Sequence, residues 1–221
     1  MPFGILPSED VRAGDHIAYF WETDSEFEQG VKFLSTGLLG GRDHGVVFGH
    51  DDANRRVCEI LERQGASVRA LRRQGRLTLV GPAATGDKTL AKLGTVFKKA
   101  IAGGAPLIRL LGNIGWNKPG WPGEDDTLLF EAKVTGAARQ FPAVIVCMYD
   151  VRSLPGRIVV HGGFGTHPIA VCGNVMRVNP FHQQKFDEFA ARVPDTADAR
   201  RRPRRLARTP AARPKDVRRR R

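Results

Sequence analysis

Short apolar runs alternate with amphipathic stretches along most of this chain, and that alternation limits the folds open to it. The apolar runs occupy residues 16–20, 45–48, 76–80, 106–111, 143–149, 157–161 and 169–172. The run at 143–149 is the most apolar of these. Strands that alternate with helices are typical of βαβ units, so the sequence predicts an α/β fold with a mostly parallel sheet between helices.

The stretches between these runs carry helix signals. Thr23 followed by Glu26 has the form of a capping box, and apolar residues recur after it at helical spacing until Gly40 and Gly41. Asp51 or Asp52 is placed to cap a second helix that ends at Gly65. Further helices are expected at 88–102, 126–139 and 181–192. The connection at 162–168 is too short for a parallel crossover, so the runs at 157–161 and 169–172 are predicted to form an antiparallel hairpin near the C-terminus.

The charge of the chain is concentrated at its C-terminus. The whole sequence holds 35 Lys and Arg against 23 Asp and Glu, and residues 196–221 hold 12 of the basic and 2 of the acidic ones. The remainder therefore has a net charge of only +2. Three prolines and few large apolar residues in this segment predict a disordered tail. Such a tail either makes weak, nonspecific contact with nucleic acid or simply aids solubility.

Three cysteines, Cys58, Cys147 and Cys172, are widely spaced, with no signal peptide before them. An odd count in this arrangement indicates a reducing cytoplasm and not a disulfide framework. No apolar run approaches the ~18 residues that a membrane span requires. We therefore expect a cytoplasmic protein that makes no membrane contact.

Polar and aromatic residues follow several of the predicted strands. They are Trp21, Glu22, His50, Asp51, Asn113, Tyr149 and Asp150, with Trp116 on a nearby loop. Ligands of open α/β sheets bind outside the carboxyl ends of the strands. The sequence thus predicts a small-molecule pocket there, although helix capping and core packing explain each residue taken singly.

Catalytic and metal motifs are weak. The segment 81–89 resembles a phosphate loop, but Asp87 stands between the second glycine and Lys88. Asp150 has the position of a magnesium-binding aspartate without that loop. His161, His167 and Cys172 could join Cys147 at a metal, yet their spacing fits no zinc signature. We expect no metal, no cofactor and no catalytic nucleophile.

Several segments together resemble a known family. HIAYFWETDSEF, GVVFGHDDANRRV, PLIRLLGNIGW, GWPGEDDTLLFEAKVT, FPAVIVCMYDVRSLPGRIVVHGGFGTHP and CGNVMRVNP are similar, in order, to the MEDS domain, the methanogen/methylotroph sensory domain named after the dichloromethane-response regulator DcmR. The resemblance implies a three-layer fold like that of RecA and KaiC ATPases, with the phosphate loop lost and a turn at residues 20–23 in its place. It also implies sensing of simple hydrocarbon derivatives in prokaryotic signalling.

The resemblance carries over twelve positions without assigning their roles: His16, Glu22, His50, Asn113, Trp116, Glu131, Cys147, Tyr149, Asp150, His161, His167 and Cys172. The ligand-binding residues expected from both arguments are Trp21, Glu22, His50, Asp51, Asn113, Trp116, Tyr149, Asp150, His161 and His167. Family members often carry a DNA-binding or kinase module beside this domain, and no such module is evident in this chain.

These observations predict a lead at 1–14, a sensory domain at 15–193 and a disordered basic tail at 194–221. The expected function is non-catalytic. The domain would bind a small organic ligand at the strand ends and relay that event to a signalling partner or to transcription. Two alternatives remain: a degenerate ATPase that uses Asp150 and Glu22, and a nucleic-acid accessory protein that acts through its tail.

Overall fold

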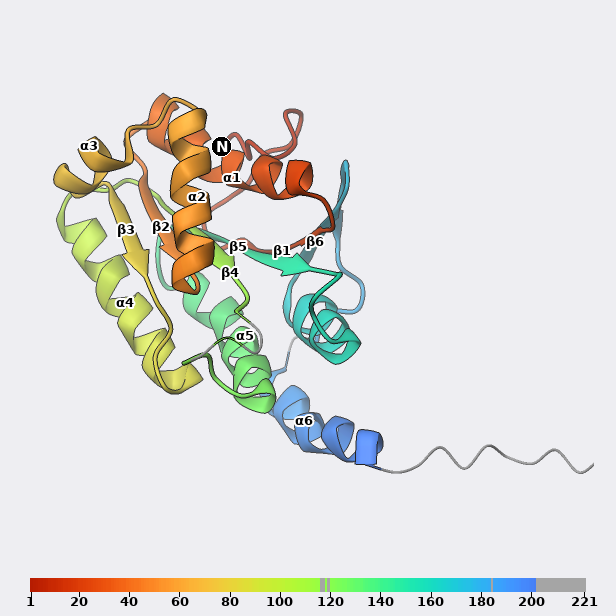
Figure 1. Ribbon diagram of the computed structural model, residues 1–221. Coiled ribbons are helices and arrows are strands. Elements are labelled where there is room, and N and C mark those ends of the chain that lie inside the picture. The colour runs from red at the N-terminus through yellow and green to blue at the C-terminus, as the bar shows by residue number, and fades with distance from the viewer. Residues whose placement is uncertain (116–117, 119, 184, 202–221) are drawn as a thin grey trace, which may run out of the picture.

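The computed structural model describes residues 1–115, 118, 120–183 and 185–201, with the backbone alone described from 194. Seven strands form one sheet with helices on both faces (Figure 1). The strands are β1 (His16–Trp21), β2 (His44–Phe48), β3 (Leu77–Val80), β4 (Ile108–Asn113), β5 (Ala143–Asp150), β6 (Ile169–Cys172) and β7 (Val175–Val178). The helices are α1 (Asp24–Gly40), α2 (Asp51–Arg63), α3 (Val68–Arg73), α4 (Gly86–Ala102), α5 (Glu124–Ala138), the π-helix η1 (Ile158–Phe164) and α6 (Phe186–Arg201).

The sheet has the order β3-β2-β4-β5-β1-β6-β7, and every neighbouring pair is parallel except β6 and β7. This confirms the three-layer, mostly parallel α/β fold and its antiparallel C-terminal hairpin. The hairpin, however, joins β6 to β7 and not residues 157–161 to β6. The strand predicted at 157–161 is wrong, because this run belongs to the helical segment that contains η1.

A short apolar run does not by itself separate strand from helix. Here Pro155 begins a turn, and its carbonyl oxygen accepts from the backbone N–H groups of Ile158 and Val159. Gly163 then packs so closely that a Cβ there would lie 2.6 Å from the ring of Phe20. These contacts turn Ile158 toward the core and leave Val160 exposed.

Alternate residues of each strand face the two outer layers. One apolar core holds Ile17 and Tyr19 of β1 and packs under α1, α2, α3 and the N-terminal segment around Phe3. The opposite core holds Ala18 and Phe20 and packs under α4, α5, η1 and the start of α6. The central strands are buried on both faces, which explains their near-continuous apolar sequence.

Local signals set most helix boundaries. The capping box is present at α1: the Thr23 hydroxyl accepts from the Glu26 N–H, and the Glu26 carboxylate accepts from the Thr23 N–H. His50 caps α2, and not Asp51 or Asp52, which occupy its first turn. The closing helix begins at Phe186, later than the predicted 181, because the Asn179 side chain accepts from the Phe181 N–H and holds a turn.

Helix α6 continues to Arg201, so the segment predicted to be disordered from 194 begins inside a helix. Residues 202–221, with most of the basic tail, lie outside the described residues. Among the described residues, no helix is both long and apolar enough to cross a membrane.

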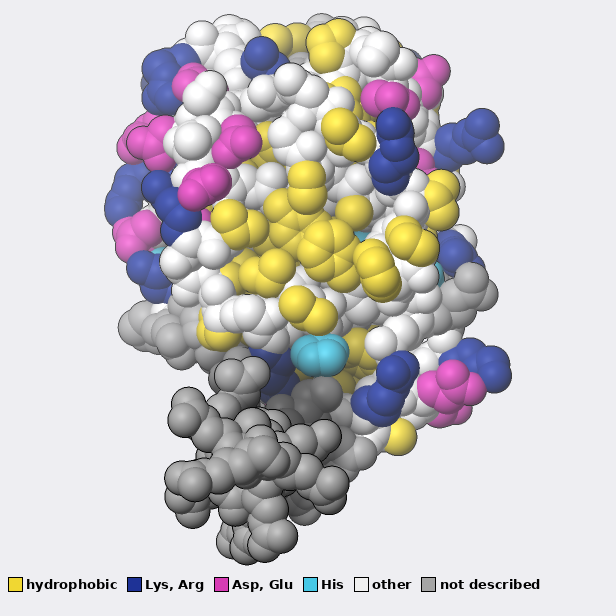
Figure 2. All heavy atoms as spheres, turned by 90° about the vertical axis from the view of Figure 1, so that its right-hand side faces the viewer, with side chains coloured by type: hydrophobic (Ala, Val, Ile, Leu, Met, Phe, Trp, Pro, Cys, Tyr) yellow, Lys and Arg dark blue, Asp and Glu magenta, His cyan; other side chains and the backbone are white. Residues whose placement is uncertain are grey.

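Hydrophobic side chains gather on the face that carries η1 and the β6–β7 hairpin (Figure 2). Exposed apolar residues of these elements and of the following turn are Val160, Val175, Val178 and Phe181. Because β7 is the last strand of the sheet, its outer edge is unpaired within the described chain.

Candidate functional site

A cavity of about 1400 Å³ lies between the sheet, α4, α5 and the segment that leads to α6. Its floor comes from β4 and β5 and is mostly apolar, with Leu110, Ile145 and Cys147 among the lining residues. Cys147 pairs with Ala18 on one side and Gly112 on the other. Both neighbours of Cys147 are small residues, and the Cys147 side chain lines the cavity.

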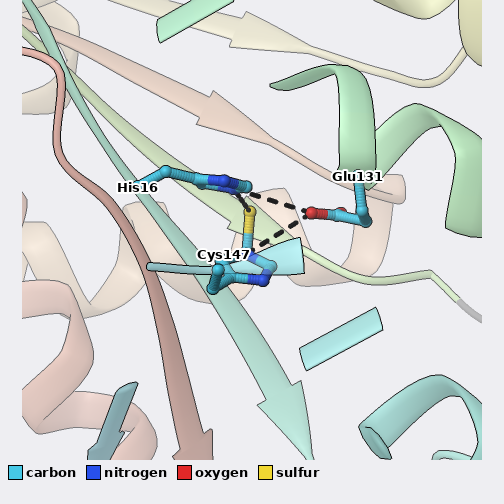
Figure 3. Close-up of side chains that lie close together, drawn as sticks. His16, Glu131 and Cys147 are labelled. Atoms are coloured by element: carbon cyan, nitrogen blue, oxygen red, sulfur yellow. Dashed lines mark hydrogen bonds and ion pairs between the residues drawn. The ribbon is translucent and has the colours of Figure 1, made fainter. Parts of the chain in front are cut away.

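The wall of this cavity adjoins a buried polar cluster made by His16, Glu131, Cys147 and His167 (Figure 3). Their relative exposures are 0%, 1%, 4% and 0%. His16 begins β1, Cys147 lies within β5, Glu131 projects from α5, and His167 precedes β6. The parallel pairing of β5, β1 and β6 brings these residues together from positions up to 151 residues apart in the sequence.

The distances within the cluster are short. His16 Nε2 lies 3.4 Å from Cys147 Sγ and 3.7 Å from Glu131 Oε2. His167 Nε2 lies 3.5 Å from the same Glu131 oxygen. Among the described residues, the His167 Nε2 and the neighbouring Tyr149 hydroxyl have no hydrogen-bond partner, and the Glu131 carboxyl has only its contact with the Cys147 thiol. Buried polar groups are ordinarily paired, so this group is unusual.

Hydrogen bonds around the cluster fix the tautomers of both histidines. The Thr135 hydroxyl donates to the Thr166 carbonyl oxygen at 2.7 Å, so its oxygen accepts from His16 Nδ1 at 2.8 Å. His167 Nδ1 lies 3.1 Å from the Gly162 carbonyl oxygen, which can only accept. Each ring therefore carries its proton on Nδ1, and each Nε2 lone pair faces Glu131.

Burial dominates the electrostatics of these groups. It raises the pKa of Glu131 to about 8 and lowers the pKa of His167 to about 3. Burial, with a smaller effect of His167, also lowers the pKa of His16. The pKa of the Cys147 thiol is raised by burial and by Glu131. Near neutral pH the metal-free cluster thus consists of neutral groups.

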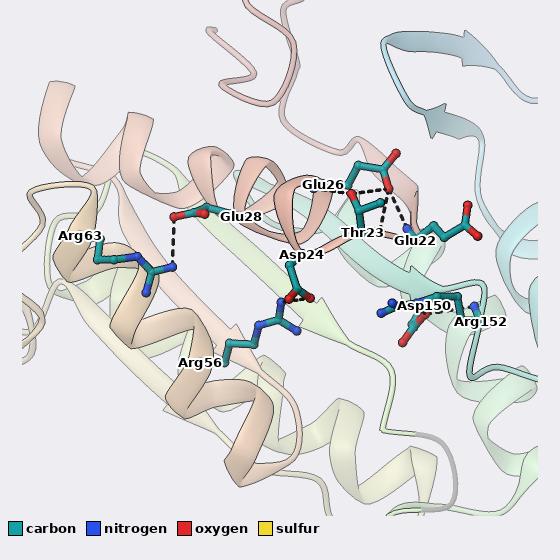
Figure 4. Close-up of polar contacts among 9 residues, drawn as sticks. All are labelled: Glu22, Thr23, Asp24, Glu26, Glu28, Arg56, Arg63, Asp150 and Arg152. Carbon is teal, nitrogen blue, oxygen red and sulfur yellow. Dashed lines mark hydrogen bonds and ion pairs between the residues drawn. The ribbon is translucent and has the colours of Figure 1, made fainter.

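The strand-end edge predicted from sequence is organised differently (Figure 4). Trp21 and Asp150 are paired across β1 and β5, and Asp150 accepts from the backbone N–H of Arg152 at 3.0 Å. The Arg56 and Arg152 guanidinium groups lie 5.7 and 5.5 Å from the Trp21 ring centroid. The Trp21 Nε1 has no hydrogen-bond partner among the described residues, and neither the large cavity nor a small pocket near α6 is lined by Trp21, Glu22 or Asp150.

The turn after β1 contains an internal carboxylate that accepts from backbone N–H groups at the start of α1. Glu26 Oε2 accepts from the N–H of Glu22 at 2.8 Å and of Thr23 at 2.9 Å. These two backbone bonds also lower the pKa of Glu26. Backbone N–H groups around a helix N-terminus can bind an anion, and here those of the cap residue Thr23 and of Glu22 before it already bond to the Glu26 carboxylate.

Residues 15–168 match the family described as MEDS, the methanogen/methylotroph, DcmR sensory domain. The chain belongs to the MEDS family. The MEDS region begins one residue before His16 and ends one residue after His167, so it contains the whole buried cluster. The β6–β7 hairpin and α6 lie beyond it.

A solved structure supports the fold of this MEDS domain. A KaiC-like protein from the hyperthermophilic archaeon Pyrococcus horikoshii OT3 superposes with a TM-score of 0.53 at 14% identity. The alignment covers 77% of this chain and 78% of that one. The similarity confirms a relative of the RecA/KaiC fold. No curated protein matches the chain in sequence.

The residues predicted from sequence to bind a ligand lie in several different parts of the structure. His50 is the helix cap, Asp51 is exposed, and Asn113 is buried with its amide nitrogen unpaired among the described residues. His161 borders a separate small pocket near α6. Trp116 lies outside the described residues. Tyr149 lies beside Asp150 at the end of β5, but its fully buried ring packs against His167, with centroids 5.5 Å apart, so both residues belong to the buried cluster.

The metal grouping considered from sequence also changes. His167 and Cys147 do meet, but Cys172 is exposed and His161 lies in η1. Their places are taken by His16 and Glu131. The family resemblance includes both positions. Motif spacing does not identify them as ligands, because Glu131 fits the pattern of an amphipathic helix.

Proposed function

We propose that this MEDS domain is a cytoplasmic, non-catalytic sensor that binds a small, mostly apolar organic molecule in the cavity between α4 and α5. The observation that carries the proposal is the cavity itself. A largely apolar hollow with a few polar groups is the usual form of a small-molecule site. Membership of a sensory family supports the same conclusion, and simple hydrocarbon derivatives suit such a lining.

The relay would run from the cavity to η1. Thr135 and Thr166 line the cavity, and the Thr135 hydroxyl donates to the Thr166 carbonyl oxygen. Thr166 and His167 both bond to the Gly162 carbonyl oxygen within η1, and Val160 of η1 is exposed on the apolar face. π-Helices are often found at functional sites. A ligand that binds one conformation of these hydrogen-bonded residues better than another would increase the population of the conformation that it prefers.

Replacing Gly94 with leucine should block ligand binding while leaving the fold intact. Gly94 lies in α4 and lines the cavity, and a Cβ there would meet no atom within 4 Å. Leucine also favours helix by about 0.5–1 kcal/mol over glycine. We expect at least one member of a panel of small halogenated and one-carbon compounds to raise the Tm of the wild-type protein. The G94L variant should lose most of that shift.

The matched control is Gly40→Leu, at the exposed end of α1 on the opposite face, where a Cβ also meets open space. It should keep the ligand-induced shift. Hydrogen–deuterium exchange should in addition show ligand-dependent protection in residues 158–164. A panel that leaves the Tm of the folded wild-type protein unchanged would contradict the proposal, as would equal loss in both variants.

Nucleotide hydrolysis is one of the two alternatives left by the sequence, and the capping geometry disfavours it. The N–H groups of Glu22 and Thr23 already bond to Glu26, so a phosphate would have to displace a carboxylate. We expect isothermal titration with millimolar Mg-ATP to give no binding heat. Saturable heat that disappears in an Asp150→Asn variant would favour the ATPase instead.

A further inference from the structure

We propose that His16, Glu131, Cys147 and His167 bind a divalent transition-metal ion of the zinc class. The inference does not depend on the ligand proposed above. It rests on four donor atoms, one from each residue, that all lie within 4.8 Å of one another. The donors are two imidazole nitrogens, a thiol sulfur and a carboxylate oxygen, which are the ligand types of protein zinc sites.

The spacing of the donors suits a tetrahedral centre. Metal–ligand bonds of about 2.0–2.3 Å place the ligand atoms of such a centre about 3.3–3.6 Å apart. The separations of 3.4 Å between His16 and Cys147, 3.7 Å between His16 and Glu131, and 3.5 Å between His167 and Glu131 are close to this range. The remaining pairs lie no more than 4.8 Å apart, so they would have to close to reach this spacing.

The surrounding hydrogen bonds already hold both rings in the form that a metal needs. Thr135 accepts from His16 Nδ1, and the Gly162 carbonyl oxygen accepts from His167 Nδ1. Metal-ligating histidines nearly always donate their second N–H in this way. Both Nε2 atoms are therefore left as lone-pair donors beside the same Glu131 oxygen. The ring centroids of His16 and His167 lie 3.8 Å apart, so the two rings would have to turn apart to bind one ion.

The charges balance as well. A thiolate and a carboxylate supply two negative charges, and two neutral imidazoles supply none. A divalent cation would leave the buried centre neutral, which avoids the cost of an uncompensated buried charge. It would also give a partner to the His167 Nε2, which has no hydrogen bond among the described residues. Glu131, Cys147, Thr135 and Thr166 line the large cavity, which offers a route for the ion.

The competing explanation is a neutral, metal-free cluster in which the Glu131 carboxyl and the Cys147 thiol donate to the histidines. Metal analysis of the purified full-length protein separates the two explanations. We expect close to one equivalent of divalent transition metal per chain. After chelation, titration with Co²⁺ should restore one equivalent and give a thiolate-to-metal charge-transfer band in the near ultraviolet.

Cys147→Ser should remove that band and Glu131→Gln should lower Co²⁺ affinity, whereas Cys172→Ser, which changes an exposed cysteine, should leave both unchanged. Thr135→Val should weaken metal binding by about 10- to 100-fold through loss of the His16 hydrogen bond. If C147S does not fold by circular dichroism, E131Q and T135V provide the same comparison. A folded wild-type protein without stoichiometric metal, before and after reconstitution, would overturn the proposal. So would a thiolate band that C172S removes and C147S does not.

Discussion

Replacing Arg109 with methionine should lower the free energy of unfolding by about 3–5 kcal/mol, a loss typical of breaking a buried ion pair. The Arg109 side chain projects from β4 into the α1 layer with only 3% of its surface exposed. Its Nε donates to Asp43 at 2.7 Å, and its other nitrogens donate to the carbonyl oxygens of Phe33 and Pro2. Without it, a mostly buried carboxylate and two carbonyl oxygens would lose their donor.

Urea denaturation followed by circular dichroism measures this change. Arg63→Met is the matched control, because Arg63 pairs with Glu28 at the surface and such pairs contribute about 0–1 kcal/mol. Adding Asp43→Asn to the Arg109 variant should recover part of the loss, since it removes the unpaired charge. A loss below about 1 kcal/mol for R109M alone would show that the pair is not the anchor inferred from its contacts.

The metal-depleted protein should be most stable near pH 6.5 and lose stability on both sides. His16 and His167 have pKa values in the folded chain that lie below their ordinary 6.5. As the pH falls from 6.5, the unfolded chain binds protons at these two positions that the folded chain does not. Their contribution is therefore present above pH 6.5 and is lost toward the folded pKa of His167, about 3.

The contribution of Glu131 to folding stability changes with pH in the opposite direction. Its folded pKa is about 8 against an ordinary 4.5, so its contribution is present below pH 4.5 and is lost as the pH rises to 8. Between pH 4.5 and 6.5, unfolding adds two protons at the histidines and releases one from Glu131, so the unfolded chain binds one proton more and stability rises with pH. Above pH 6.5 only the Glu131 proton is released, so stability falls with pH. The cluster should contribute a slope of about 1.4 kcal/mol per pH unit to each limb. Burial also lowers the pKa values of His44, His161 and His182, and these histidines make the acid limb steeper than the cluster alone would.

Chemical denaturation at a series of pH values, with a chelator present throughout, tests this profile. Glu131→Gln should flatten the limb between pH 6.5 and 8 and keep the acid limb. A bound metal would abolish the alkaline limb, because Glu131 is then ionised in the folded state. A stability that stays constant from pH 4.5 to 8 in the chelated protein would show that the cluster is not buried as described.

The sequence was sufficient to predict secondary structure where capping residues or the hydrophobic pattern of a single segment determine it. The capping box at Thr23 and Glu26 fixes the start of α1, and the near-continuous apolar run of β5 indicates a central strand buried on both faces. It failed at 157–161, where three apolar residues fit either a strand or a helix. Contacts around Gly163 and Phe20, which are distant in sequence, decide between them.

The sequence by itself determined the α/β class, the order of most elements and, through resemblance, the MEDS family. Only the tertiary structure decided which polar residues meet. His16, Glu131, Cys147 and His167 are separated by 16 to 115 residues from one to the next, so no spacing rule connects them. The parallel register of β5, β1 and β6 and the packing of α5 place them at one buried point. Strand order depends on long-range pairing, and this is why the cluster appears only in the folded chain.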